Sequence, residues 1–190
     1  SVVSLSEQDD GAPPYRAFWY NKRGRSIWTA VTEDGINFRD KRPVIALEEF
    51  LPMREDGILH GEDVFHFSYD RWAERFIGSF KCHQLAHTPA GVQQFRRSFI
   101  LGESGNGFDW TLRGHPLRAD EKDDRLAVER AGGRVEGSRT ELYGMPLFRY
   151  GNTIVGLPWL FIITDDDSAR APNETFLAWS EDEGDTWKRP

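Results

Sequence analysis

The stretch 180–187, which reads SEDEGDTW, is the third copy of the phrase that decides the fold of this chain. The earlier copies are 32–38 (TEDGINF) and 104–110 (SGNGFDW), and the glycines of the three copies are separated by 72 and 77 residues. A period this long is typical of arrays and propellers. Asp and Asn side chains bond turn backbone and glycine supplies positive φ. We therefore predict that Asp34, Asn106 and Asp182 build tight turns, each followed by a strand that begins with an aromatic residue.

Strand-like runs precede each copy of the phrase. They lie at 2–5, 15–20 and 26–31 in the first unit, at 64–68, 75–81 and 97–101 in the second, and at 146–150, 153–157, 161–164 and 175–179 in the third. Each unit thus reads as a four-stranded antiparallel meander, and radially repeated meanders are the blades of a β-propeller. The sequence predicts an all-β fold in one partial propeller domain, with blades at about 1–45, 59–115 and 141–190. Only 118–129 could form a helix, and its high charge makes a solvated loop an equal alternative.

Composition restricts the classes of partner. A net charge of −7 argues against a nucleic-acid ligand, which needs a basic face. No apolar run is long enough to span a membrane. The aromatic fraction of 13% suits stacked sheets and also sugar-binding surfaces. The single cysteine, Cys82, excludes an internal disulfide and is predicted to lie buried in a strand. The cellular location is left open.

The three phrases resemble the Asp-box of sialidase-type propellers, and 180–187 fits the pattern S-x-D-x-G-x-T-W at every specified position. The order of the blades is more similar to the five-bladed propellers of the glycoside hydrolase 43/32-like superfamily. The runs 15–38 and 64–81 match the first two blade patterns of that superfamily, and 141–146 followed by 156–159 resembles its acid-bearing blade. Three blades cannot close a five-bladed ring. We expect the chain to be a fragment; blades from another chain, or an open array, are the alternatives.

The resemblance implies a set of catalytic carboxylates. In that superfamily three acidic residues lie at the starts of inner strands, and the matching positions here are Asp63 and Glu141. Glu62 would replace Asp63 if the strand register slipped by one residue, because such a slip exchanges the two faces. Glycoside hydrolysis uses one protonated and one ionised carboxyl group on either side of the scissile bond. The first unit begins at Ser1, so we expect the position of its acid to be absent or removed.

Other side chains are candidates for binding the substrate. His60 could contact a sugar or tune a carboxylate, and a purely structural histidine is the alternative. Trp72, at a hairpin tip, and Trp159, in a strand broken by proline, are placed to stack on a sugar ring. Trp110 and Trp187 are instead expected to be core residues.

The sequence predicts no metal site and no cofactor. His83 and His87 are four residues apart, but no cysteine or glutamate nearby completes a ligand set. The run 165–167 consists of three aspartates, and three successive residues cannot all point at one ion. A solvated loop is expected there.

These observations lead to one main functional hypothesis and two alternatives. The main hypothesis is a glycoside hydrolase-like propeller that hydrolyses or binds a glycan through Asp63 and Glu141. The first alternative is a non-catalytic carbohydrate-binding or scaffold module, because fold does not imply activity. The second is a sialidase-like enzyme, which needs arginines to clamp a substrate carboxylate, and Arg96, Arg97 and Arg139 are available. An open propeller exposes sheet edges, which favours association with further copies or with the missing blades.

Overall fold

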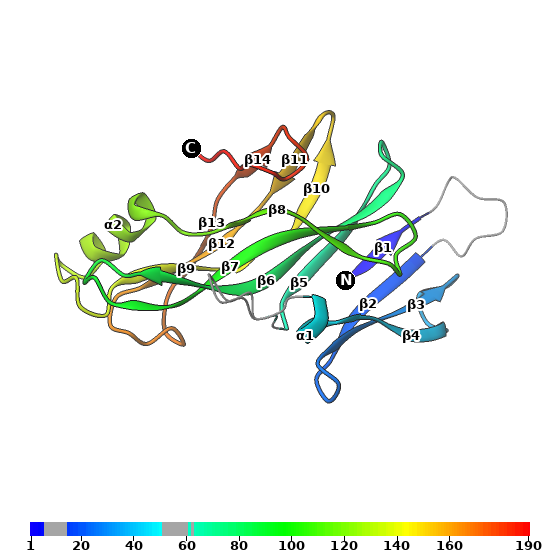
Figure 1. Ribbon diagram of the computed structural model, residues 1–190, viewed down its shortest axis with the longest axis horizontal. Helices are drawn as coiled ribbons and strands as arrows, with labels where there is room; N and C mark the ends of the chain where they lie inside the picture. The colour runs from blue at the N-terminus through cyan, green and yellow to red at the C-terminus, as the bar shows by residue number, and fades with distance from the viewer. Residues whose placement is uncertain (6–14, 51–60, 62) are drawn as a thin grey trace.

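The computed structural model describes residues 1–5, 15–50, 61 and 63–190, and its ribbon is shown in Figure 1. The described chain consists of antiparallel sheets and two helices, α1 (Leu47–Phe50) and α2 (Glu121–Arg130). The predicted all-β fold is confirmed. Two predicted binding residues, His60 and Glu62, lie outside the described residues.

The first two units are four-stranded meanders in which each strand pairs with the next along the chain. The first sheet has the order β1-β2-β3-β4, and the second has the order β5-β6-β7-β8. Their strands are β1 (Val2–Ser4), β2 (Tyr15–Asn21), β3 (Ser26–Thr32), β4 (Arg39–Ala46), β5 (Phe65–Asp70), β6 (Arg75–His87), β7 (Gln93–Ser104) and β8 (Thr111–Leu117). The long hairpin of β6 and β7 extends beyond β5 toward α2 (Figure 1).

The third unit differs from the predicted meander. Strands β10 (Leu147–Tyr150), β11 (Thr153–Gly156) and β14 (Ala178–Ser180) form a three-stranded sheet. Strand β12 (Trp159–Ile163), the next strand along the chain after β11, does not join this sheet. It pairs with β9 (Arg139–Gly144) and β13 (Asn173–Thr175). The predicted third strand of this blade therefore belongs to a different sheet. Pro158 precedes β12 and has no N–H to donate to a ladder, so the chain changes sheets at this point.

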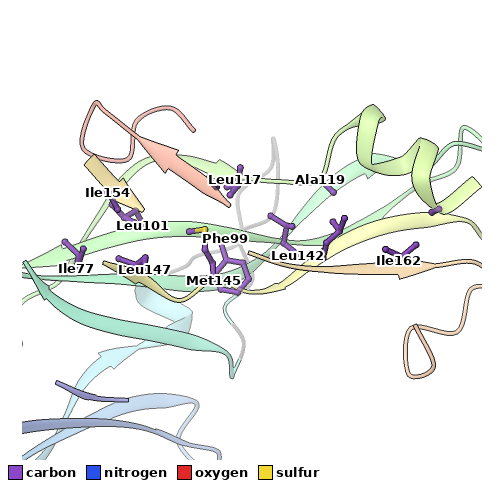
Figure 2. Packing of buried hydrophobic residues seen from close by; sticks show 13 residues of the cluster. Ile77, Phe99, Leu101, Leu117, Ala119, Leu142, Met145, Leu147, Ile154 and Ile162 are labelled. Carbon is purple, nitrogen blue, oxygen red and sulfur yellow. The ribbon is translucent and has the colours of Figure 1, made fainter. Parts of the chain in front are cut away.

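The middle sheet lies between two hydrophobic cores. On one face Phe67, Phe80 and Ile100 pack with Phe18 and Ile27 of the first sheet. Because side chains alternate along a strand, the neighbours of Ile100 in β7 point the other way. Figure 2 shows this second core, which holds Ile77, Phe99, Leu101, Leu147 and Ile154.

The leading strands of the three units are neighbours in space. Strand β5 lies against β1 on one side and against β10 on the other. Cys82 is fully buried in the first of the two cores, so its predicted placement is confirmed.

The three repeated turns share one hydrogen-bond pattern. In the first, the backbone N–H groups of Ile36 and Asn37 each donate to Asp34 Oδ1 over 2.8 Å. The N–H of the turn glycine donates to the hydroxyl of the first residue in all three copies. Asn106 and Asp182 accept backbone N–H groups in the same way, which confirms the predicted turn role. The φ angles of the three glycines are 74°, 74° and 94°, a region that favours glycine.

The segment for which helix and loop were equal alternatives forms helix α2. Its N-cap is Asp120, whose carboxylate accepts from the N–H groups of Lys122 and Asp123, and Asp123 completes a capping box. The buried carboxylate of Asp124 connects the helix to two sheets, because it accepts hydrogen bonds from Arg96 of β7 and Thr140 of β9. Trp110 and Trp187 pack against the two cores as expected.

Candidate functional site

The β13–β12–β9 sheet has two different faces. One is apolar: Leu142, Leu160 and Ile162 are buried in the core beneath α2. The opposite face carries Tyr143 and Phe161, which are half-buried and whose rings stack with centroids 4.6 Å apart. Phe161 pairs with Glu141 in the ladder, so aromatic and acidic side chains occupy the same face.

Trp159, at the start of β12, contacts His66 of the middle sheet. The strand register shifts between Trp159 and Leu160, and the indole covers Gly144 so closely that a methyl group on Gly144 would lie 2.2 Å from the ring. The predicted sugar-stacking residue Trp159 is thus half-buried, two residues before Phe161 in β12.

The predicted catalytic residue Glu141 is buried and fully engaged in ion pairs. Its side chain is 4% exposed. Arg97 Nη1 donates to Oε2 over 2.5 Å, and Arg139 Nε donates to Oε1 over 2.8 Å. Arg139 also pairs with Asp166. Charge-assisted bonds to both oxygens hold the carboxylate in one orientation.

The other predicted catalytic residue, Asp63, faces solvent. Its side chain is 58% exposed, and its Oδ1 accepts a hydrogen bond from Lys81 Nζ over 3.0 Å. The hydrogen bond from the Lys81 ammonium outweighs partial burial and holds the pKa of Asp63 below its ordinary value. Asp63 is therefore an ionised, accessible carboxylate at neutral pH.

The two carboxylates belong to one group of side chains centred on an aromatic ring. Lys81 Nζ lies 4.8 Å from the centroid of the Tyr143 ring, and Arg97 Cζ lies 5.8 Å from it. We call Asp63, Lys81, Tyr143, Arg97 and Glu141 the Tyr143 cluster. Sequence reasoning missed Lys81 and Tyr143. A lysine inside the mostly apolar run 76–82 was the available signal.

His66, on β5, contacts Trp159. Its ring meets the edge of Trp159 with centroids 5.1 Å apart, and its Nε2 is buried without a hydrogen-bond partner among the described residues. Burial, together with the charge of the terminal amino group, lowers the pKa of His66 to about 4. A neutral imidazole with an unused nitrogen therefore lies beside the aromatic face at neutral pH.

The structure does not bring Trp72 to this face. Trp72 is 77% exposed and lies in the turn after β5, where its backbone N–H donates to Asp70. Asp63 precedes the opposite end of that strand. At about 3.3 Å per residue, the six residues of β5 put roughly 20 Å between the two positions.

The arginines of the sialidase alternative already have partners. Arg97 and Arg139 pair with Glu141, and Arg96 is buried against Asp124. In the part of the chain that the structure describes, no group of three or more His, Cys, Asp or Glu side chains is placed to hold a metal ion. In the same part, no helix is long and apolar enough to cross a membrane.

Comparison with known proteins finds no matching family model and no matching curated protein. Among solved structures, the chain is similar to an N-acetylgalactosamine deacetylase from F. plautii in complex with blood group B trisaccharide. The TM-score is 0.48 at 14% identity, over 92% of this chain and 50% of that one. It is also similar to a glycoside hydrolase candidate from Parabacteroides distasonis, with a TM-score of 0.40 at 14% identity over 74% of this chain and 36% of that one. The chain thus spans half or less of these proteins.

Proposed function

We propose that this chain binds a carbohydrate on the face formed by Tyr143, Trp159 and Phe161. The observation that carries the proposal is the stack of two half-buried aromatic rings, Tyr143 and Phe161, beside the cations of Lys81 and Arg97, with Trp159 two residues before Phe161 in the same strand. Aromatic faces pack against the apolar faces of sugar rings, and a few well-placed polar groups fix the orientation of a ligand. The resemblance of the repeated turns and blades to carbohydrate-active propellers points to the same class of ligand.

Two versions of this function differ in the role of the carboxylates. In the hydrolytic version Asp63 is the base, and Glu141, oriented by Arg97 and Arg139, is the second carboxyl group. The non-catalytic version is favoured by one feature of Glu141. Both its oxygens accept from guanidinium groups and its side chain is 4% exposed, so a glycosidic oxygen has little access to it. We therefore place glycan binding first and hydrolysis second.

Binding is tested by isothermal titration with soluble oligosaccharides chosen from a glycan array. We expect Trp159→Ala to weaken the affinity about tenfold or more, because a lost aromatic stacking partner removes a large contact area. Trp72→Ala is the matched control and should bind as the wild type does. Circular dichroism verifies that both variants are folded. Failure of every glycan to bind, or a loss in Trp72→Ala alone, would refute the proposed face.

Hydrolysis is tested with a panel of aryl glycosides. If the hydrolytic version holds, Asp63→Asn should lower kcat by about 100-fold or more, since a positioned base contributes 10²–10⁴-fold. Glu141→Gln should have a comparable effect. Turnover that is absent, or unchanged in both variants, removes the hydrolytic version and leaves glycan binding standing.

A further inference from the structure

A second group of cations lies between the first two sheets and shares no residue with the Tyr143 cluster. Arg16 of β2 and Arg42 of β4 both lie over the ring of Phe108, with Cζ 4.2 and 3.6 Å from its centroid. Phe108 comes from the turn between β7 and β8. A cavity of about 390 Å³ opens here, and Asp40 and Lys41 also line it.

A β-bulge builds one side of this cavity. Arg39 pairs with Val31 and Arg42 pairs with Thr29, so Asp40 and Lys41 together stand opposite the single residue Ala30. Asp40 has a φ of 56°, which is unusual for a residue with a side chain. Bulges re-aim side chains at the point where they interrupt a ladder. This bulge brings Arg42 onto Phe108.

The two guanidinium groups over Phe108 have no anionic partner among the residues that the structure describes. Within the described ranges, no carboxylate lies within 4.0 Å of Arg16 or Arg42, and Asp40 forms an ion pair with neither. Arg16 Nε and Nη1 are buried and make no hydrogen bond there. Arg39, which lies three residues before Arg42 in β4, is by contrast paired with Glu33, with its Nη2 2.6 Å from Oε1.

Arg16 and Arg42 lie over the same ring, so their positive charges repel each other. Burial and the charge of Arg42 both lower the pKa of Arg16. An anion that entered the cavity would offset the repulsion between the two guanidinium groups.

We propose that Arg16, Lys41 and Arg42 form a binding site for an oxyanion, namely a carboxylate, sulfate or phosphate group carried by a ligand. Arg42 is exposed, and the N–H edge of a guanidinium matches two oxygens of such a group. Lys41 is exposed at the rim and adds a third positive charge. The site is independent of the glycan-binding face, so either proposal can fail without the other.

The experiment is isothermal titration of the protein with inorganic sulfate, inorganic phosphate and glucuronate, at a low ionic strength kept constant with NaCl. Arg42→Gln removes one charge, and because Arg42 is exposed the variant should fold, which circular dichroism verifies. Arg39→Gln is the matched control, since it removes an equal charge from the same strand and the same sheet face. We expect wild-type protein to bind at least one of the anions, Arg42→Gln to bind it about tenfold or more weakly, and Arg39→Gln to stay within about twofold.

Comparison of the three anions shows which kind of oxyanion the site binds. Binding of glucuronate alone identifies a carboxylate site, and binding of sulfate or phosphate identifies a site for tetrahedral anions. Either result supports the proposal if Arg42→Gln loses the binding selectively. Absence of heat with all three anions, equal binding by Arg42→Gln, or an equal loss in Arg39→Gln would overturn it.

Discussion

Replacing Asp124 by alanine should destabilise the protein more than any surface change on the same helix. Asp124 is 8% exposed and accepts four hydrogen bonds. Arg96 Nη2 and Nη1 donate over 2.6 and 3.0 Å, and the N–H and hydroxyl of Thr140 each donate over 2.9 Å. The side chain therefore joins α2, β7 and β9 at a single buried point.

The cost follows from what the substitution leaves behind. Asp124→Ala would strand the guanidinium of Arg96, which is 6% exposed, and would remove the acceptor of a buried N–H. Removing one partner of a buried ion pair costs about 3–5 kcal/mol. For a chain of this length, about 2–4 °C per kcal/mol converts that cost into a fall in Tm of roughly 6–20 °C.

The assay is urea unfolding followed by circular dichroism, with thermal unfolding as a second measurement. Glu129→Ala, an exposed change on the same helix, is the control and should alter the free energy of unfolding by no more than about 0.5 kcal/mol. Arg96→Ala and the double variant complete a cycle, in which the double variant should cost clearly less than the two single variants added together. A loss below about 1 kcal/mol for Asp124→Ala, or strict additivity, would show that the buried pair is not coupled in solution.

Two further predictions concern the aromatic face. Gly144→Ala places a methyl group 2.2 Å from the Trp159 ring, so it should lower the free energy of unfolding by about 1–3 kcal/mol and change the tryptophan fluorescence. Gly105→Ala, which meets no atom within 4 Å, should leave the fluorescence unchanged; equal effects in both would mean that the indole is not seated on Gly144. His66 has a folded-state pKa of about 4 against an ordinary 6.5, so the unfolded chain binds more protons and stability should fall as pH drops from 6.5 to 4. His66→Gln should flatten that part of the stability–pH curve, and an unaltered slope would show that His66 titrates normally in the folded state.

The turns were predictable because their chemistry is local. Asp34, Asn106 and Asp182 each bond backbone groups two to four residues further along the chain, and the adjacent glycine adopts a positive φ. Such interactions need no information from elsewhere in the fold. The same holds for the two meanders of the first units, whose strands pair with their neighbours in sequence.

The switch of β12 to another sheet was not predictable from the pattern of the third unit. Run 161–164 reads as the next strand of a meander, and β12 instead pairs with β9, which precedes that unit's first strand. Burial of Leu160 and Ile162 beneath α2 stabilises this pairing. The helix itself was only one of two alternatives, since a helix this short is marginal in isolation and takes most of its stability from tertiary packing.

The amino-acid sequence by itself determined the repeated turns, the alternating strands and thus the all-β class, because these depend on residues a few positions apart. It also indicated Asp63 and Glu141 as candidate catalytic carboxylates, through the resemblance to a known superfamily. Only the tertiary structure decided what those carboxylates touch: Arg97 reaches Glu141 across 44 residues of chain, and Lys81 reaches Asp63 across 18. Partners so far apart are selected by how the sheets pack, and sheet packing sums many weak contacts that no short stretch of sequence contains.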